Sequence, residues 1–202
     1  MKLYFSPGAC SMAPHIALRE AGLEFELDKV DVRAKKTQNG GDYLKINPKG
    51  YVPALELDNN EVLTEAAVIV QYIADRRPES GLAPKLGTME RYRLMEWLNF
   101  CATEIHKTLG ALFKPNVTPE MRENQIALFG KRADILVQQL DGKSYAMGDK
   151  FTVVDAYLFT LLGWTNVLKL DTSAWPVLAD YRARVAARPA VKETLRAEGL
   201  VK

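Results

Sequence analysis

The sequence contains little cysteine and little histidine, with two of each in 202 residues. Cys10 and Cys101 lie far apart and form no CxxC pair, and neither has the spacing of a zinc ligand relative to His15 or His106. The N-terminus has no signal-like apolar segment, so two cysteines indicate reduced thiols and not a disulfide framework. We therefore expect a cytoplasmic protein without a metal site.

The sequence also lacks an excess of charge of either sign and lacks a long hydrophobic run. Its 27 basic and 25 acidic residues leave a net charge of +2, so we expect no nucleic-acid partner. No apolar run reaches the length of a membrane span, so we expect no membrane partner. The chain does have 48% hydrophobic residues, which is enough for one or two compact domains.

The first 80 residues alternate strand and helix signals. Residues 2–5 predict a strand, residues 11–21 a helix that Gly22 stops, and residues 25–32 a second, parallel strand. A short helix ending at Pro48, a hairpin around residues 58–60 and a helix capped by Thr64 follow. This order predicts a small α/β domain over residues 1–80.

The rest of the chain has helical patterns and no convincing strand. Prolines and glycines indicate a linker at about residues 77–87, and an all-helical domain is predicted over 87–202. Residues 152–168 are apolar on all sides, which indicates a central buried helix, and Thr152 and Asp155 form a capping-box pattern at its start. The other expected helices span 88–113, 118–140 and 175–189.

Cys10 stands between the first strand and the first helix, in the segment SPGACS. A helix start presents unpaired backbone N–H groups and the positive end of the helix dipole, and both favour a thiolate. Ser11 and the following amides are placed to donate hydrogen bonds to the sulfur. This predicts a reactive thiol with a lowered pKa, and the competing interpretation is a small buried hydrophobe. Because no second cysteine is nearby, a reactive Cys10 would form mixed disulfides with an outside thiol.

Two segments of the α/β domain could bind a peptide-like ligand. A cis Val52-Pro53 bond would turn the Val52 backbone outward, where it could pair with an extended ligand. Glu65 and Ala66 open a helix, which suits a carboxylate, while the Glu65 side chain could hold an amine. The structural alternatives are a proline at a strand start and an ordinary acidic residue in a first helical turn.

One helix of the second domain has a polar face beside its apolar side. Asn99, Thr103, His106 and Lys107 recur at helical spacing. His106 is a candidate hydrogen-bond donor or proton shuttle, and the alternative is a solvated face. Cys101 lies among apolar neighbours and is predicted to be core.

In their order along the chain, these segments resemble the cytosolic glutathione transferases, and among them the bacterial beta class. The segments that carry the resemblance are SPGACS, NPKGYVPAL, LTEAAVIVQYIAD, WLNFCATEIHK and VDAYLF. The resemblance implies an α/β plus all-α fold, with a thioredoxin-like N-terminal domain followed by an all-helical C-terminal domain. It also implies a homodimer that uses glutathione as a co-substrate.

The resemblance implies roles for individual residues. Cys10 would lie beside the glutathione sulfur, and Val52, before cis Pro53, would pair with the cysteinyl part. Glu65 and Ala66 would hold the γ-glutamyl end. The other implied contacts are Lys35 near the glycyl carboxylate, His106 and Lys107 near the sulfur, and Asn99, Thr103 and Glu104 across the dimer interface.

The chain departs from the family pattern at its first strand. Beta-class chains often have tyrosine where this chain has Phe5, and strand alternation sends Tyr4 to the opposite face. The candidates for activating glutathione are therefore Cys10, Ser11 and His106.

Three functions are compatible with these residues. The first is conjugation of glutathione to a small hydrophobic electrophile, held near Phe113, Tyr157 and Trp164, although these aromatics would serve equally well as core. The second uses Cys10 itself as the nucleophile, in thiol–disulfide reduction or reductive dehalogenation. Two adjacent thiolates repel, so these two chemistries compete. The third is a non-catalytic ligand-binding or regulatory protein on the same fold.

Overall fold

A mixed five-stranded sheet forms the N-terminal part of the structure, a computed structural model that describes residues 1–201. Its strands are β1 (Lys2–Phe5), β2 (Glu26–Asp31), β3 (Lys36–Thr37), β4 (Ala54–Glu56) and β5 (Val62–Thr64). They lie in the order β3-β2-β1-β4-β5, and only β1 and β2 pair in parallel. The crossover helix α1 (Met12–Glu20) allows this parallel pairing.

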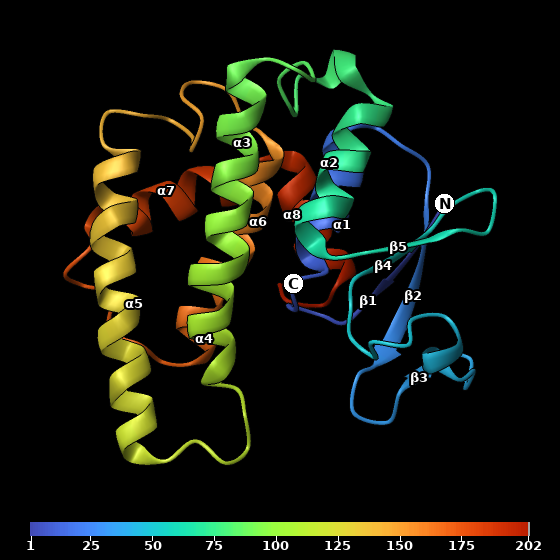
Figure 1. The fold of residues 1–202 in the computed structure, drawn as a ribbon, viewed down its shortest axis with the longest axis horizontal. Coiled ribbons are helices and arrows are strands. Elements are labelled where there is room, and N and C mark those ends of the chain that lie inside the picture. Colours follow the sequence, from blue (N-terminus) through green and yellow to red (C-terminus); the bar gives the residue numbers. More distant parts are fainter. Residues whose placement is uncertain (202) are drawn as a thin grey trace.

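The strand alternation in β1 sends its side chains to two different hydrophobic clusters. Leu3 and Phe5 join the main core with α1 and α2 (Ala66–Arg76), whereas Tyr4 packs with Tyr43 on the other face. The Tyr4 hydroxyl donates a hydrogen bond to Glu56 at 2.6 Å. The predicted orientation of Tyr4 is therefore confirmed, and the face of the sheet that bears α1 and α2 lies against the helical part (Figure 1).

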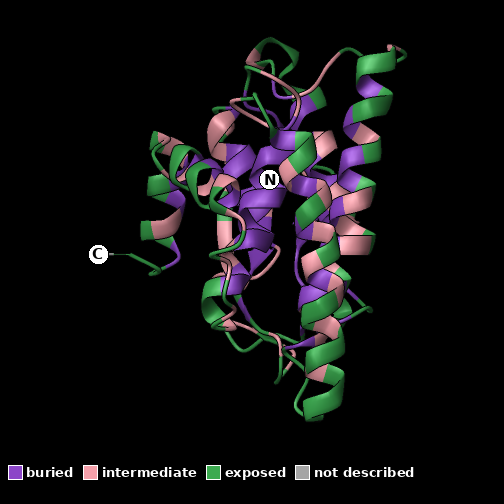
Figure 2. Ribbon diagram, turned by 90° about the vertical axis from the view of Figure 1, so that its left-hand side faces the viewer, coloured by how far each residue is buried: buried purple, intermediate pink, exposed green. Residues whose placement is uncertain are grey.

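Helices make up the rest of the described chain. They are α3 (Met89–Phe100), α4 (Lys107–Ala111), α5 (Pro119–Leu140), α6 (Val153–Val167), α7 (Pro176–Ala186) and α8 (Pro189–Ala197). Helix α6 is buried along most of its length at the centre of the molecule, with exposed helices around it (Figure 2). It contacts α1, which joins the two parts through one continuous core. No helix among residues 1–201 is both long and apolar enough to cross a membrane.

The start of α6 carries the predicted capping box. Asp155, fully buried, accepts hydrogen bonds from the backbone amide of Thr152 at 2.8 Å and from the Thr152 hydroxyl at 3.1 Å. It also accepts from the backbone amide of Ala146 at 2.7 Å and from the Tyr181 hydroxyl at 2.8 Å. Asp155 therefore caps its own helix and ties the preceding loop and α7 to it.

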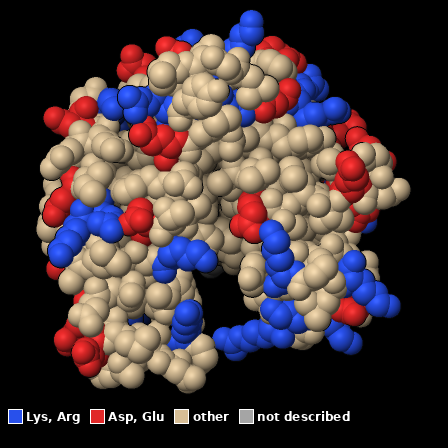
Figure 3. Space-filling model, viewed as in Figure 1, with Lys and Arg blue, Asp and Glu red and all other residues tan. Residues whose placement is uncertain are grey.

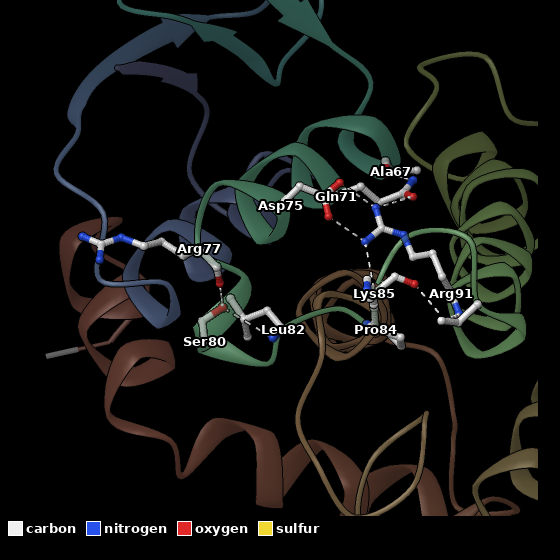
Figure 4. Close-up of polar contacts among 10 residues, drawn as sticks. Ala67, Gln71, Asp75, Arg77, Ser80, Leu82, Pro84, Lys85 and Arg91 are labelled. Carbon is white, nitrogen blue, oxygen red and sulfur yellow. Dashed lines mark hydrogen bonds and ion pairs between the residues drawn. The ribbon is translucent and has the colours of Figure 1, made fainter.

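A buried arginine joins α3 to α2 across the segment that connects the two parts. Arg91 is 2% exposed, and its two terminal nitrogens each donate to one carboxylate oxygen of Asp75 at 2.8 Å. The guanidinium also donates to Gln71 and to the Pro84 carbonyl oxygen (Figure 4). This paired geometry holds α2, which begins at the candidate site, against the helical part.

The structure differs from the sequence-based expectations at four places. Helix α2 begins after Glu65 and not at Thr64, and the helix expected over 88–113 is interrupted by a π-helical turn, Cys101–His106. Strand β3 and helix α8 were not expected. The short helix before Pro48 is confirmed as the 3₁₀ turn Tyr43–Lys45. The boundary at residues 77–87 stays a prediction.

Candidate functional site

A cavity of about 610 Å³ lies between the α/β part and the helical part. Its walls come from the loop before α1, the loop before β4, the start of α2, the π-helical turn and α6. In the surface view, a notch separates the two parts, and Lys and Arg side chains border it on both sides (Figure 3). The fold thus gathers segments far apart in sequence around one opening.

Cys10 lies in this cavity, just before α1, and is half-buried. Its sulfur donates a hydrogen bond to the Val52 carbonyl oxygen at 3.2 Å. Burial raises the pKa of Cys10 to about 12, although the backbone amides of Cys10 and Ser11 act in the opposite direction. The expected lowering of this pKa is therefore wrong, because desolvation outweighs the helix-start amides. At neutral pH the Cys10 side chain is a thiol.

The Ser11 hydroxyl does not face the cavity. Ser11 is fully buried, and its hydroxyl exchanges hydrogen bonds with the backbone of Ser6, at 3.1 Å from the Ser6 amide and 3.2 Å to the Ser6 carbonyl oxygen. These bonds fix the loop that carries Cys10. The contribution of Ser11 to the thiol comes from its backbone amide, which favours the charged form of Cys10.

The Val52-Pro53 peptide is cis, and both residues line the cavity. The preceding Tyr51 carbonyl oxygen is held by the Tyr43 hydroxyl at 2.9 Å and by the Asn47 side-chain amide at 2.6 Å. Two buried or nearly buried donors thus position the turn that presents the Val52 backbone.

Glu65 is the residue before α2 and has φ 71, in the left-handed region that a residue with a Cβ rarely adopts. Such a conformation costs of order 1–3 kcal/mol and tends to occur at functional sites. Ala66 and Ala67, the first two residues of α2, line the cavity, and their backbone amides have no carbonyl partner within the helix. The Glu65 carboxylate accepts a hydrogen bond from Lys49 Nζ at 2.6 Å.

His106 and Tyr157 form the helical wall of the cavity. The His106 Nδ1 atom lies 2.6 Å from the Tyr157 hydroxyl oxygen, and the His106 ring meets Trp164 edge-on at 4.9 Å between centroids. Burial lowers the pKa of His106 to about 4, and Lys107 acts in the same direction. Burial also raises the pKa of Tyr157. Both groups are therefore neutral near pH 7 and act as hydrogen-bonding partners, not charges.

The aromatic residues predicted for the electrophile extend from this wall. Trp164 contacts Phe113 at 5.5 Å between ring centroids, and Phe113 is 47% exposed. The Trp164 Nε1 donates to the Gly8 carbonyl oxygen at 2.8 Å. Phe113, Trp164, His106 and Tyr157 thus form one contiguous aromatic group beside the loop of Cys10.

The structure brings most of the predicted site residues together but not all of them. Lys35 donates to the Gly50 carbonyl oxygen at 2.7 Å and lies outside the cavity lining. Glu104 pairs with Arg132 of its own helical part, at 2.6 Å. Those that line the cavity are Cys10, Val52, Pro53, Glu65, Ala66, Thr103, His106, Lys107 and Tyr157, whereas Ser11, Lys35, Asn99, Glu104, Phe113 and Trp164 do not.

Lys49 is the main lining residue that sequence reasoning missed. It bonds both Glu65 and the Thr64 hydroxyl, the latter at 2.9 Å. It stands in the segment NPKGYVPAL, but nothing local distinguishes it from the other lysines near it. Asn47 and Tyr51 of the same segment also line the cavity.

The fold is a thioredoxin-like sheet domain followed by a helical domain. The cavity between them is lined by a cysteine, a cis proline and a helix start. This combination is typical of a class of proteins that bind thiols. Comparisons with known proteins agree. Residues 8–76 match the family model of the glutathione S-transferase N-terminal domain, and residues 100–189 match that of the C-terminal domain.

Full-length relatives give the same result. Glutathione S-transferase GstA of Escherichia coli O157:H7 is 43% identical over 99% of this chain and 100% of its own. The bacterial beta-class glutathione S-transferase of Sphingomonas chungbukensis superposes with a TM-score of 0.96 at 47% identity, covering 100% of both chains. A sphingomonad glutathione S-transferase solved with glutathione gives a TM-score of 0.95 at 46% identity over 100% of both chains.

The chain belongs to the glutathione S-transferase family. The predicted family, the two-part fold class and the assignment as a glutathione transferase are thereby confirmed.

Proposed function

We propose that the chain binds glutathione in the cavity at Cys10 and transfers it to a small hydrophobic electrophile. The observation that carries the proposal is the meeting of Cys10, the Val52 backbone and the Glu65 helix start in one cavity. These groups suit the thiol, the peptide backbone and the γ-glutamyl end of glutathione respectively. The relative solved with glutathione, which shares the fold over its whole length, supports the same conclusion.

The charges of the cavity suit the two ends of glutathione. Glu65 provides a carboxylate for the γ-glutamyl amine, and the amides at the start of α2 suit its carboxylate. Lys107 lines the same cavity and suits the glycyl carboxylate, whereas Lys49 is bonded to Glu65 at the γ-glutamyl end. Lys35, held on the Gly50 carbonyl oxygen outside the cavity lining, is proposed as a further cation for the glycyl end.

We infer that Cys10 acts on the glutathione sulfur as a hydrogen-bond donor. Its raised pKa keeps the proton on Cys10 at neutral pH. A thiol that leaves the Val52 carbonyl oxygen, to which it donates here, can donate to the glutathione thiolate, whereas a Cys10 thiolate would repel it. This favours conjugation, in which the glutathione thiolate attacks the electrophilic carbon, over a reaction in which Cys10 is the nucleophile.

The aromatic group beside the cavity suits the electrophile. Tyr157, Trp164 and the exposed Phe113 offer an apolar surface next to the Cys10 loop. The neutral His106–Tyr157 pair can donate a hydrogen bond to a leaving group or a substrate oxygen.

We also propose a cytoplasmic homodimer, as the family pattern implies. Large apolar side chains such as Tyr51, Met89 and Tyr92 are more than half exposed, which suits a surface that a second copy covers. Asn99 and Thr103 would approach the partner's glutathione. Glu104 is held by Arg132 and would have to leave that pair to do so. Light scattering coupled to size exclusion tests the dimer, and a monomeric mass would refute it.

Calorimetric titration with glutathione tests the proposed function directly. We expect binding at one site per chain, weakened by Glu65→Ala and retained by Cys10→Ala. We further expect the Cys10→Ala variant to lose conjugation activity toward an aryl halide, because the glutathione thiolate loses the hydrogen bond from Cys10. Cys101→Ala is the matched control, because Cys101 is buried in the core and does not line the cavity. Absence of glutathione binding by the wild type would refute the proposal.

A further inference from the structure

Lys49 occupies the carboxylate that the proposed function gives to the amine of glutathione. Its Nζ donates to Glu65 Oε1 at 2.6 Å and to the Thr64 hydroxyl at 2.9 Å, and all three residues line the cavity. The α-amine of the γ-glutamyl group is also an ammonium at neutral pH, so it competes with Lys49 for Glu65. Among the described residues 1–201, no other basic group forms a salt bridge with Glu65. The free protein therefore holds its own cation where the cation of the ligand would bind.

The backbone that carries Lys49 is fixed, whereas its side chain is free to change partner. The Lys49 amide donates to the side-chain oxygen of buried Asn47 at 3.1 Å, and the Gly50 amide donates to the Asn47 carbonyl oxygen at 2.9 Å. The side chains of Lys49 and Glu65 are 48% and 62% exposed. An ion pair this exposed contributes little to stability, so its exchange for another pair costs little. Because the lysine stem is flexible, Nζ can shift to a neighbouring anion while the turn stays in place.

A second anion comes within reach of Lys49 when glutathione binds. Ala66 and Ala67 open α2, and their free amides suit the α-carboxylate of the γ-glutamyl group. Thr64, which Lys49 already contacts, stands just before Glu65 and this helix start. The α-amine and the α-carboxylate are joined to the same carbon atom. An amine seated on Glu65 therefore brings the carboxylate close to the Lys49 ammonium.

We propose that Lys49 is a specificity-determining residue that exchanges partners when glutathione binds, an inference that rests on the proposed function. The ligand ammonium replaces Lys49 on Glu65, and the Lys49 ammonium moves to the α-carboxylate of the same γ-glutamyl group. A thiol that lacks the amine leaves Lys49 on Glu65. A thiol that lacks the carboxylate releases Lys49 without giving it a new partner. Lys49 therefore selects thiols that carry both charges of a free amino acid.

Lys49 makes the two charges of the ligand depend on each other. Without the α-carboxylate, the amine gains Glu65 only by removing Lys49 from it, so the amine adds little to the affinity. With the α-carboxylate, the displaced Lys49 forms a new ion pair, so the same amine adds more. If the Lys49 cation is removed, the amine meets an unpaired Glu65 in both cases. Its contribution then no longer depends on the carboxylate.

Peptides that differ only in these two charges test the dependence. They are glutathione, glutaryl-Cys-Gly without the amine, 4-aminobutyryl-Cys-Gly without the α-carboxylate, and butyryl-Cys-Gly without either. Competition calorimetry measures the Kd of each peptide. In wild type we expect the amine to improve the Kd about fivefold more when the carboxylate is present than when it is absent, the upper range for an exposed ion pair. In Lys49→Met this excess should fall below about twofold.

Two further variants separate the exchange from a general loss of charge. Lys45→Met removes a lysine from an exposed position of the same segment, outside the cavity lining, and should keep the wild-type excess. Lys49→Arg keeps a cation and should also keep it. The inference is overturned if Lys49→Met retains the wild-type excess, or if Lys45→Met or Lys49→Arg loses it. Absence of glutathione binding by wild type is a different result, since it refutes the proposed function and this inference with it.

Discussion

Cys10 is subject to two opposing influences, and their balance decides its chemistry. The amides at the start of α1 favour the thiolate, while removal from water favours the thiol. Desolvation is the larger influence here, so the residue keeps its proton at neutral pH. The same position in a more open loop would have the lowered pKa of a nucleophilic cysteine. The role that we propose for Cys10, a hydrogen-bond donor to the glutathione thiolate, therefore depends on its burial.

The alkylation rate of Cys10 tests this protonation state. Because the thiolate is the reactive form, labelling by iodoacetamide should be slow at pH 7.5 and should continue to increase above pH 10, following a pKa of about 12. Mass spectrometry of the labelled peptide measures the rate, and Cys10→Ala identifies any contribution from Cys101. A rate that reaches its plateau by pH 8 would contradict the raised pKa.

His106 should make stability depend on pH in the acid range. Its folded-state pKa of about 4 lies below the usual value of 6.5, so the unfolded chain binds more protons between these values. The stabilisation is present above pH 6.5 and is lost as pH falls through 6.5 toward 4. Relative to His106→Gln, wild type should lose about 2 kcal/mol of unfolding free energy between pH 7.5 and 4.5. Urea denaturation at both pH values measures this, and a constant difference between the proteins would count against it.

Helix α6 depends on one carboxylate more than its length suggests. Asp155 accepts hydrogen bonds from two backbone amides and two hydroxyls, which come from its own cap, the preceding loop and α7. The helix is apolar and central, so a change in the structure of its first turn would disturb the packing of every element that contacts it. The cap is therefore a junction of the helical part and not only a local helix signal.

Removal of the Asp155 carboxylate should be strongly destabilising. We expect Asp155→Ala to lower the unfolding free energy by about 3–5 kcal/mol, because several buried donors lose their acceptor. The exposed Asp149, in the loop that precedes α6, provides the control, and Asp149→Ala should cost less than about 0.5 kcal/mol. Equilibrium denaturation compares the two, and equal stabilities would refute the junction role.

Elements with a local sequence signal were predictable, and those that depend on distant contacts were not. The Thr152–Asp155 cap and the β4–β5 hairpin are fixed by neighbouring residues, and both were expected. Strand β3 has two residues and exists only because β2 pairs with it. The π-helical turn contains no proline or glycine, so the sequence of residues 101–106 does not predict it.

The candidate site divides in the same way. Three of the site residues stand at the ends of helices or strands, where nearby proline, glycine or capping residues make the boundary predictable: Cys10, Val52 and Glu65. Lys49 matters because the fold brings it to Glu65, and Cys10 is a thiol because the fold buries it. Neither effect has a local signal, which is why the sequence predicted the place of the cysteine but not its protonation state.

At the scale of the whole molecule, the C-terminal helix returns to the loop that carries Cys10. Glu198, just after α8, accepts hydrogen bonds from the Gly8 amide at 2.8 Å and, through its other oxygen, from His15 Nδ1 at 2.9 Å. Arg19 donates to the His15 Nε2 at 3.1 Å, which leaves the Nδ1 nitrogen to carry the proton. The helical part thus holds the loop of the α/β part from both sides, with Trp164 on the Gly8 carbonyl oxygen.

Loss of one Glu198 oxygen should loosen this loop. A Glu198→Gln side chain keeps one acceptor oxygen for two buried donors. We therefore expect the free energy of unfolding to decrease by about 1–3 kcal/mol. We also expect faster backbone hydrogen exchange over residues 6–12. We also expect weaker glutathione binding, since Cys10 lies in that segment. Lys192→Gln, at an exposed position on α8 outside this network, is the control. Unchanged exchange over residues 6–12 in the Glu198 variant would show that this contact does not hold the loop.

The Glu198–Gly8 contact joins residues separated by 190 positions. During synthesis the ribosome adds Gly8 early and Glu198 almost two hundred residues later, so the nascent sheet domain emerges without the acceptor for its own loop amide. The loop that carries Cys10 therefore reaches its final form only after the helical part has been made and has closed on it, and a chain stalled before α8 would carry Cys10 in an unfinished loop.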